Sequence, residues 1–155
     1  MSKNLNKKEI EKFSRQIILK NIGAAGQKKI LSSKVLIVGM GGLGCPVAEF
    51  LTRSGIGTLG IADHDTVSLS NIHRQSLYNE KDINQSKVKI AKKKLNKINS
   101  KTKINIFNLK LNKTTFEKII KNYDYIVDGT DNFESKFLIN DLSLKYKKFL
   151  VTGAI

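Results

Sequence analysis

The chain has 155 residues and a formal net charge of +15, from 28 lysines and arginines against 13 aspartates and glutamates. An apolar fraction of 40% excludes a disordered chain, and apolar runs of only a few residues exclude a membrane-spanning helix. One cysteine excludes an internal disulfide, and the first residues have charge but no apolar core of a signal peptide, so we expect a cytoplasmic protein.

The N-terminal part of the chain predicts helices. Apolar residues at helical spacing indicate one helix over residues 7–19, and a second, short helix follows over residues 21–31 after a glycine-containing turn. We therefore expect residues 1–32 to form a helical extension.

Strands alternate with helices over the rest of the chain. We predict strands over residues 35–38, 58–63, 103–109, 123–131 and 149–154, and helices over residues 44–54, 86–99, 114–122 and 132–147. Thr114 is the expected N-cap of its helix, because Glu117 follows three residues later. The long polar connection over residues 64–85 is the kind of loop in which function concentrates.

This alternation predicts an α/β fold, a Rossmann-like doubly wound parallel sheet with helices on both faces. Residues 33–155 would form this core, and the whole chain, residues 1–155, would form a single domain. The carboxyl ends of all strands then meet at one edge, and ligands bind there near the point where the strand order reverses.

A glycine-rich turn follows the first strand, in the stretch VLIVGMGGLG. Gly39, Gly41 and Gly44 have the spacing G-x-G-x-x-G, and Gly42 adds a fourth glycine. Such a turn lets backbone N–H groups and the positive end of the next helix approach a phosphate. Asp63 ends the next strand, where an acidic residue binds ribose. The turn predicts a nucleotide, but by itself it does not separate NAD from ATP.

Side chains in and after the polar connection favour a polyphosphate. Asn71, Arg74 and Lys87 can clamp phosphate groups, and Asp131 at the tip of the fourth strand can hold Mg²⁺ against them. Taken singly, each has an ordinary structural explanation: a turn residue for Asn71, a surface ion-pair partner for Arg74, one lysine of a solvated face for Lys87 and a helix cap for Asp131. Neither His64 nor His73 has partners at metal-ligand spacing in the sequence, so we expect no other metal site.

Several motifs together resemble one known family. RQIIL, VLIVGMGGLGCPVAEFL, DHDTVSLSNIHRQ, QSKV and DGTDN are similar to bacterial adenylyltransferases that activate ubiquitin-like sulfur-carrier proteins for molybdopterin and thiamine biosynthesis. These enzymes are relatives of the ubiquitin-activating enzymes. Members of the family continue beyond the fifth strand, so we expect this chain to match their N-terminal portion and to be truncated at its C-terminus, as a fragment, the product of a split gene or a naturally short homologue. The resemblance leaves open whether this portion is active alone.

The resemblance implies an enzyme that uses ATP and Mg²⁺ to adenylate the C-terminal glycine carboxylate of the carrier and releases pyrophosphate. It implies a homodimer in which Arg15 reaches the nucleotide of the neighbouring subunit. The implied nucleotide-binding residues are Gly39, Gly41, Gly42, Gly44, Asp63, Asp65, Ser70, Asn71, Arg74, Lys87, Asp131 and Asn132. Arg15, Arg74, Lys87 and Asp131 are implied to act in catalysis, with Asp131 as the metal ligand.

Three alternatives stay open at this point. One is a tRNA threonylcarbamoyladenosine dehydratase of the same superfamily, although SNIHRQ favours the sulfur-carrier branch. The others are an NAD-binding redox domain and an inactive nucleotide-binding fragment. The lysines are scattered and mixed with asparagine and isoleucine, which argues against a dedicated nucleic-acid surface. We expect no membrane partner.

Overall fold

The computed structural model describes residues 4–153, and its five strands form one sheet. The strands are β1 (Lys34–Val38), β2 (Thr58–Ala62), β3 (Lys103–Phe107), β4 (Tyr125–Asp128) and β5 (Phe149–Thr152). All neighbours pair in parallel, in the order β3-β2-β1-β4-β5. The order therefore reverses between β1 and β4, which is where such sheets bind ligands.

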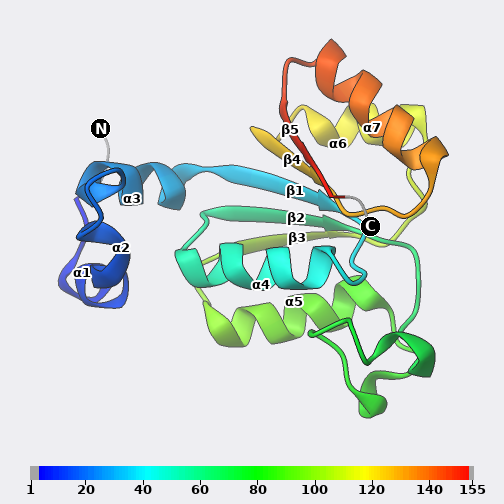
Figure 1. The fold of residues 1–155 in the computed structure, drawn as a ribbon, viewed down its shortest axis with the longest axis horizontal. Helices are drawn as coiled ribbons and strands as arrows, with labels where there is room; N and C mark the ends of the chain where they lie inside the picture. Colours follow the sequence, from blue (N-terminus) through cyan, green and yellow to red (C-terminus); the bar gives the residue numbers. More distant parts are fainter. Residues whose placement is uncertain (1–3, 154–155) are drawn as a thin grey trace.

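Helices cover both faces of the sheet, which confirms the doubly wound fold. They are α1 (Lys7–Lys12), α2 (Ser14–Ile17), α3 (Gly23–Ser32), α4 (Gly44–Ser54), α5 (Lys87–Ile98), α6 (Lys113–Ile120) and α7 (Phe133–Lys145). Figure 1 shows α4 and α5 on one face and α6 and α7 on the other, with α1 to α3 beyond one end of the sheet. None of the helices within residues 4–153 is long and apolar enough to cross a bilayer.

The two faces bury separate apolar clusters, and β1 contributes to both. Successive strand residues point to opposite faces, so Ile37 packs with Ala48 and Leu95 while Leu36 packs with Phe116. All five side chains are fully buried. Burial of each Leu, Ile or Phe stabilises the fold by about 1.5–3 kcal/mol, so these contacts hold the helices against the sheet.

The predicted single helix over residues 7–19 is wrong, because the chain forms α1 and α2 with a break between them. Phe13 lies at the break with φ −105° and ψ 14°, and its ring is buried. It fills the space beside Gly55, where a Cβ would lie 2.5 Å from Phe13 Cζ. Of the apolar residues at helical spacing only Phe13 is buried, and Ile18 is 70% exposed; the set is Ile10, Phe13, Ile17 and Ile18. Packing of one aromatic ring therefore overrides the helical periodicity.

The predicted N-cap of the helix over residues 114–122 is also wrong. Asn112 caps α6. Its Oδ1 accepts a hydrogen bond of 2.9 Å from the N–H of Thr115. In return, Oγ1 of Thr115 accepts a hydrogen bond from the N–H of Asn112. Thr114 lies exposed inside the first turn. Asparagine is the stronger N-cap of the two residue types, so the helix begins earlier than predicted.

The other boundaries differ by a few residues at strand ends. β4 ends at Asp128 and β3 at Phe107, so residues predicted as their last positions lie in the turns that follow. The polar connection contains two short 3₁₀ turns, η1 (Leu69–Asn71) and η2 (Glu80–Asp82). The last predicted strand residue, Ala154, lies outside the described residues.

Asn112→Ala should lower the free energy of unfolding by about 1 kcal/mol, because the N–H of Thr115 loses its acceptor. Thr114→Ala is the matched control and should change stability little, since the Thr114 side chain is exposed. Urea denaturation followed by circular dichroism measures both. A larger loss for Thr114→Ala than for Asn112→Ala would contradict the assignment of the cap.

Candidate functional site

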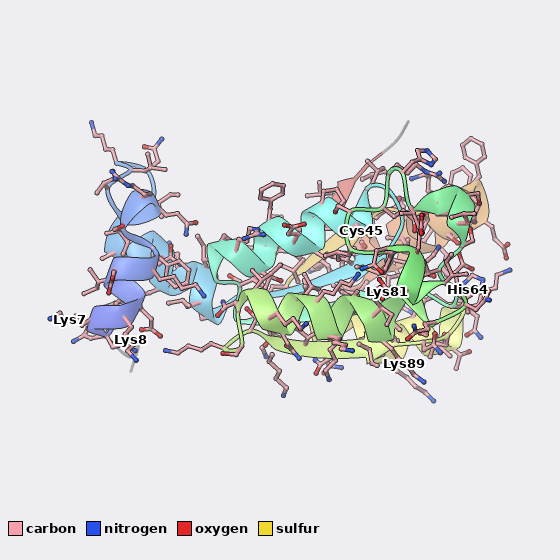
Figure 2. All side chains as sticks on the ribbon, turned by 90° about the horizontal axis from the view of Figure 1, so that it is seen from below. Lys7, Lys8, Cys45, His64, Lys81 and Lys89 are labelled. Atoms are coloured by element: carbon pink, nitrogen blue, oxygen red, sulfur yellow. The ribbon has the colours of Figure 1, made fainter. Side chains whose placement is uncertain are left out.

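A pocket of about 640 Å³ lies at the carboxyl ends of the strands. Its walls come from the turns after β1, β2, β3 and β4 and from the start of α5. His64 lines it, and Figure 2 shows His64 at the end of the molecule opposite to Lys7 and Lys8 of α1. The residues expected to bind a nucleotide that line this pocket are Gly39, Gly41, Gly42, Asp63, Asp65, Asn71, Arg74, Lys87, Asp131 and Asn132.

The four glycines of the turn after β1 have different surroundings. Gly39 has φ +89°, and a Cβ there would lie 2.8 Å from the carbonyl oxygen of Gly129. A Cβ on Gly44 would lie 1.9 Å from the carbonyl oxygen of Gly39. Gly41 and Gly42 have no such close neighbour and line the pocket. The outer glycines therefore allow the turn itself, and the inner ones leave room for a ligand.

Asp63 joins the end of β2 to the glycine turn. Its two carboxylate oxygens accept hydrogen bonds from the N–H of Met40 at 2.7 Å and from the N–H of Asp65 at 2.8 Å. Each carboxylate oxygen can accept a second hydrogen bond, so ribose hydroxyls can still donate to Asp63.

A buried tyrosine makes a further hydrogen bond to the same turn, at the carbonyl group of Met40. The Tyr78 hydroxyl lies 3.0 Å from the carbonyl oxygen of Met40 and 3.4 Å from that of Lys87, at the start of α5. The Cys45 thiol also donates to the Met40 carbonyl, at 3.3 Å. Burial raises the pKa of the Cys45 thiol to about 11 and also raises the pKa of Tyr78, so both groups stay protonated as donors. The cysteine is thus a packed residue and not a nucleophile.

Lys87 places a buried cation at the pocket. Its side chain is 6% exposed, and its Nζ lies 2.9 Å from Oδ2 of Asp65, whose side chain is half exposed. The hydrogen bond from Lys87, and to a smaller extent its charge, lowers the pKa of Asp65. The ammonium is thus fixed in place by a counter-ion at the rim of the pocket.

Arg74 contributes an exposed cation over the glycine turn. A Cβ on Gly42 would lie 3.5 Å from Cδ of Arg74, and Arg74 Nη1 donates to the carbonyl oxygen of Ser70 at 3.3 Å. The Ser70 hydroxyl lies 2.9 Å from that of Ser68 and does not line the pocket. Ser70 therefore supports the loop, and its expected contact with a nucleotide stays a prediction.

In the turn after β4, some polar side chains make hydrogen bonds within the protein and one is left unpaired at the pocket. Buried Asp128 accepts hydrogen bonds from Thr130 and from Lys136 Nζ at 3.0 Å. Asn132 is the N-cap of α7 and accepts from the N–H of Ser135 at 2.9 Å. Asp131 is exposed and has no hydrogen bond or ion pair with any residue within 4–153, so it is not the helix cap.

Two positions at the pocket could be considered for a cation, one at Asp63, His64 and Asp65 and the other at Asp131. Ligand atoms of Asp63, His64 and Asp65 lie within 4.8 Å of one another, so the expectation that His64 lacks such neighbours is wrong. However, Asp63 is engaged by backbone N–H groups and Asp65 by Lys87. The free carboxylate of Asp131 is the better fit to Mg²⁺, which binds one or two carboxylates together with substrate phosphates.

Other parts of the pocket were not predicted from the sequence. They include Gln75, Leu109, Lys110, Leu111, Thr130 and Lys136. Residues 109–111 follow β3, so the rule that ligands bind at the carboxyl ends of strands could have identified them. Gln75 is the last residue of the motif DHDTVSLSNIHRQ, although no site role was predicted for it, and no sequence signal indicates Lys136.

Two other predicted residues lie away from the pocket lining. Gly44 belongs to the first turn of α4 and contacts the backbone of Gly39. Arg15 belongs to α2, beyond the opposite end of the sheet (Figure 1). Arg15 could therefore reach a nucleotide only in the pocket of a second copy of the chain.

Residues 13–155 match the sequence model of the ThiF family. The chain belongs to the ThiF family. Among curated relatives, the adenylyltransferase and sulfurtransferase MOCS3 of Dictyostelium discoideum is 44% identical over 97% of this chain and 35% of the relative. The sulfur carrier protein adenylyltransferase of Thermus thermophilus is 37% identical over 96% of this chain and 55% of the relative. The chain therefore spans between about a third and just over half of these relatives, and they are not confined to bacteria.

Solved structures share the fold of this chain. The chain is similar to Escherichia coli MccB with ATP, with a TM-score of 0.78 and 29% identity over 83% of this chain and 38% of that one. It is also similar to the Escherichia coli tRNA N6-threonylcarbamoyladenosine dehydratase TcdA in complex with ATP. That likeness has a TM-score of 0.86 at 21% identity and covers 95% of this chain and 60% of that one. At this identity it supports the fold of the chain and not a function.

Asp65→Asn should lower the free energy of unfolding at pH 7, because buried Lys87 loses its counter-ion. The expected loss is about 1 kcal/mol, since solvent weakens the interaction at the half-exposed carboxylate. The pKa of Asp65 is lowered in the folded state, so its contribution is present above its usual pKa and is lost as the pH falls through the lowered value. The difference from the unchanged chain should therefore shrink below about pH 4.

Urea denaturation at a series of pH values measures this difference, with Asp141→Asn on the exposed surface of α7 as the matched control. A difference that persists unchanged at acid pH would show that the ion pair is not its cause.

Proposed function

We propose that this chain is the ATP-binding part of an adenylyltransferase that activates the C-terminal carboxylate of a ubiquitin-like sulfur-carrier protein. The observation that carries the proposal is the gathering of Arg74, Lys87 and the free carboxylate of Asp131 around one pocket beside a phosphate-binding glycine turn. Membership of the ThiF family and the name of the Thermus thermophilus relative, a sulfur carrier protein adenylyltransferase, support the same reaction and the same kind of partner.

The adenosine part of ATP fits the side of the pocket that β2 and β3 form. Asp63 would accept hydrogen bonds from the ribose hydroxyls with the lone pairs that the backbone leaves free. Leu109 and Leu111, in the loop after β3, would provide apolar walls for the adenine ring. Such pockets are mostly apolar with a few polar groups that fix orientation.

The phosphates fit against the glycine turn. Backbone N–H groups near Gly41 and Gly42 would donate to phosphate oxygens, and Arg74 lies directly over Gly42. The Nζ of Lys87 makes one hydrogen bond with the described residues, to Oδ2 of Asp65, so the ammonium keeps N–H groups that can donate to phosphate. Asn71, close by in the polar connection, adds a neutral amide to the wall of the pocket.

In the proposed reaction a carboxylate oxygen of the carrier attacks the α-phosphorus of ATP. A bond forms between that oxygen and the phosphorus, the bond from the α-phosphorus to the bridging oxygen breaks, and pyrophosphate leaves with its electron pair. Both reactants are negative, so the residues act by holding them together and by stabilising the charge that develops. Arg74 and Lys87 do this as cations, and no covalent protein intermediate is needed.

Asp131 would hold Mg²⁺ in this reaction. Its exposed carboxylate has no partner within residues 4–153, which fits a hard cation that also binds phosphate oxygens. When bound, the ion supplies positive charge that stabilises the leaving pyrophosphate.

A homodimer completes the proposal. Arg15 lies on α2, away from the pocket of its own chain, so its proposed role requires that the site of one subunit receive Arg15 from the other. A two-fold dimer would give two such shared sites.

Arg74→Ala and Asp131→Asn should each lower carrier-dependent exchange of pyrophosphate into ATP by about 100-fold, because each removes about 3 kcal/mol of transition-state stabilisation. The exchange is measured with radiolabelled pyrophosphate and a small protein that ends in Gly-Gly. Arg53→Ala on α4 and Asp141→Asn on α7 are matched controls with exposed side chains outside the pocket lining.

Full exchange in either pocket variant would contradict the assigned role of that residue. Exchange that requires tRNA in place of the carrier would instead support a dehydratase of the same superfamily.

Mixing Arg15→Ala chains with Asp131→Asn chains should restore activity that neither variant has alone. A mixed dimer has one site with an intact Asp131 and an intact Arg15, so an equal mixture should regain about a quarter of the original activity. Pyrophosphate exchange after mixing and re-equilibration measures the recovery. No recovery, with mixed dimers shown to form by affinity capture of a tagged variant, would contradict the shared site.

A further inference from the structure

Residues 83–116 form a segment of the chain that contains no aspartate or glutamate. The segment has ten lysines and no arginine, so it contributes +10 to the net charge of +15. It runs from the end of the polar connection through α5 and β3 to the start of α6. Three of its lysines pair with acidic residues from elsewhere in the chain, namely Lys87, Lys94 and Lys101. The other seven make no ion pair within residues 4–153.

The outer side of α5 places three of these unpaired cations in a row. Lys89, Lys93 and Lys97 are exposed and follow one another at intervals of four residues. Residues at this spacing lie on one side of a helix, about 6 Å apart along its axis. Ala91 and Leu95 pack into the apolar cluster beneath the helix, so α5 is held against the sheet with the row of lysines towards solvent.

The row continues onto the N-terminal helix α1. A cavity of about 290 Å³ lies between α1 and the end of α5, and Lys8, Lys12, Lys97 and Lys101 line it. Its acidic residue, Glu9, is paired with Lys101 at 3.2 Å. Figure 2 shows Lys89 at the end of α5 near His64, and Lys8 on α1 beyond the other end of α5. We call the six lysines of α5, α1 and this cavity the basic face: Lys8, Lys12, Lys89, Lys93, Lys97 and Lys101.

The row on α5 does not stabilise the protein by itself. Like charges four residues apart on a helix repel each other and lower its stability, which applies to Lys89 with Lys93 and to Lys93 with Lys97. None of these three side chains makes a hydrogen bond or an ion pair within the part of the chain that the structure describes. An anionic partner would remove this repulsion.

The surroundings of the row favour one class of partner. Among the described residues, every large apolar side chain that is exposed lies outside residues 83–116. The core of a protein–protein interface is enriched in aromatic residues and depleted in lysine, and stable membrane binding requires an apolar or lipid anchor in addition to charge. The same lack of exposed aromatic rings disfavours a single strand, whose bases stack on such rings. Lysines alone suffice for the phosphates of a duplex.

We propose that the basic face binds the phosphate backbone of a double-stranded nucleic acid without reading its sequence. None of its six lysines lines the pocket at the carboxyl ends of the strands, so this inference does not depend on the proposed reaction. The scatter of lysines over the whole sequence argued against such a surface. The acid-free segment and the packing of α1 beside α5 nevertheless concentrate them on one side of the fold.

The test replaces the row on α5, with Lys89→Gln, Lys93→Gln and Lys97→Gln combined. Fluorescence anisotropy with short labelled DNA and RNA duplexes of unrelated sequences measures the binding constant between about 50 and 200 mM salt. The unchanged chain should bind unrelated sequences equally. The triple variant should bind about tenfold or more weakly at low salt and should reduce the slope of log K against log salt by about 3, because three phosphate contacts are lost.

Folding is checked in the same samples. The thermal midpoint of the triple variant should stay the same or rise, since glutamine has a helix propensity similar to that of lysine and the repulsion along α5 is removed. Lys93→Gln alone should reduce the slope by about 1, so the proposal can still be tested if the triple variant does not fold.

The matched control removes the same charge elsewhere, with Lys118→Gln, Lys121→Gln and Lys147→Gln combined. These lysines are exposed and belong to α6 or follow α6 and α7, which cover the other face of the sheet (Figure 1). The control should change the slope by less than about 1.

Binding of only the DNA or only the RNA duplex would support the proposal and identify the nucleic acid. Equal losses in the two triple variants would show that net charge alone attracts the duplex and would overturn it. Displacement of the duplex by an equal charge of polyglutamate would assign the face to acidic proteins instead. Binding of phosphatidylserine vesicles with no binding of either duplex would assign it to membranes, and both results would also overturn the proposal.

Discussion

The close approach of two backbone turns at the point where the strand order reverses is the constraint on which the site depends. The turn after β1 and the turn after β4 meet at Gly39 and Gly129, where a Cβ on Gly39 would lie 2.8 Å from the other carbonyl oxygen. A side chain at Gly39 would force these turns apart, and with them the glycine turn and Asp131. In the same glycine turn the N–H of Met40 donates to Asp63 and the carbonyl oxygen of Met40 accepts from the Tyr78 hydroxyl.

Two lysine ammonium groups that line the pocket are held in place by ion pairs with aspartates of the chain. Lys87 is held by Asp65, and Lys136 is held by Asp128 and by the carbonyl oxygen of Gly153. Fixed cations need little reorganisation when a phosphate binds, and this is the usual source of electrostatic stabilisation in enzyme sites. The high net charge of the chain adds general attraction for anions, but the paired lysines give that attraction a defined geometry.

The polar groups of the pocket fall into two kinds, and the difference has a physical basis. The side chain of Asp128 accepts hydrogen bonds within the turn after β4, and the side chain of Asn132 caps α7. Asp131 and Gln75 have no side-chain partner within residues 4–153. Groups of the first kind stabilise the fold, because buried polar groups are normally hydrogen-bonded within the protein. Both groups of the second kind line the same pocket, and the exposed carboxylate of Asp131 is left available for a cation.

Sequence patterns by themselves predicted the alternation of strands and helices and the glycine turn, because these depend on residues close together in the chain. The parallel sheet followed from that alternation through the rule for right-handed crossovers. It also placed Asp63 and Asp131 at one edge, through the rule for carboxyl ends of parallel strands. Only the tertiary structure decided that Phe13 interrupts the first helix and that the amide of Gln75 is buried without a partner. Both outcomes depend on contacts between segments distant in sequence, and local patterns contain no information about which side chains will meet there.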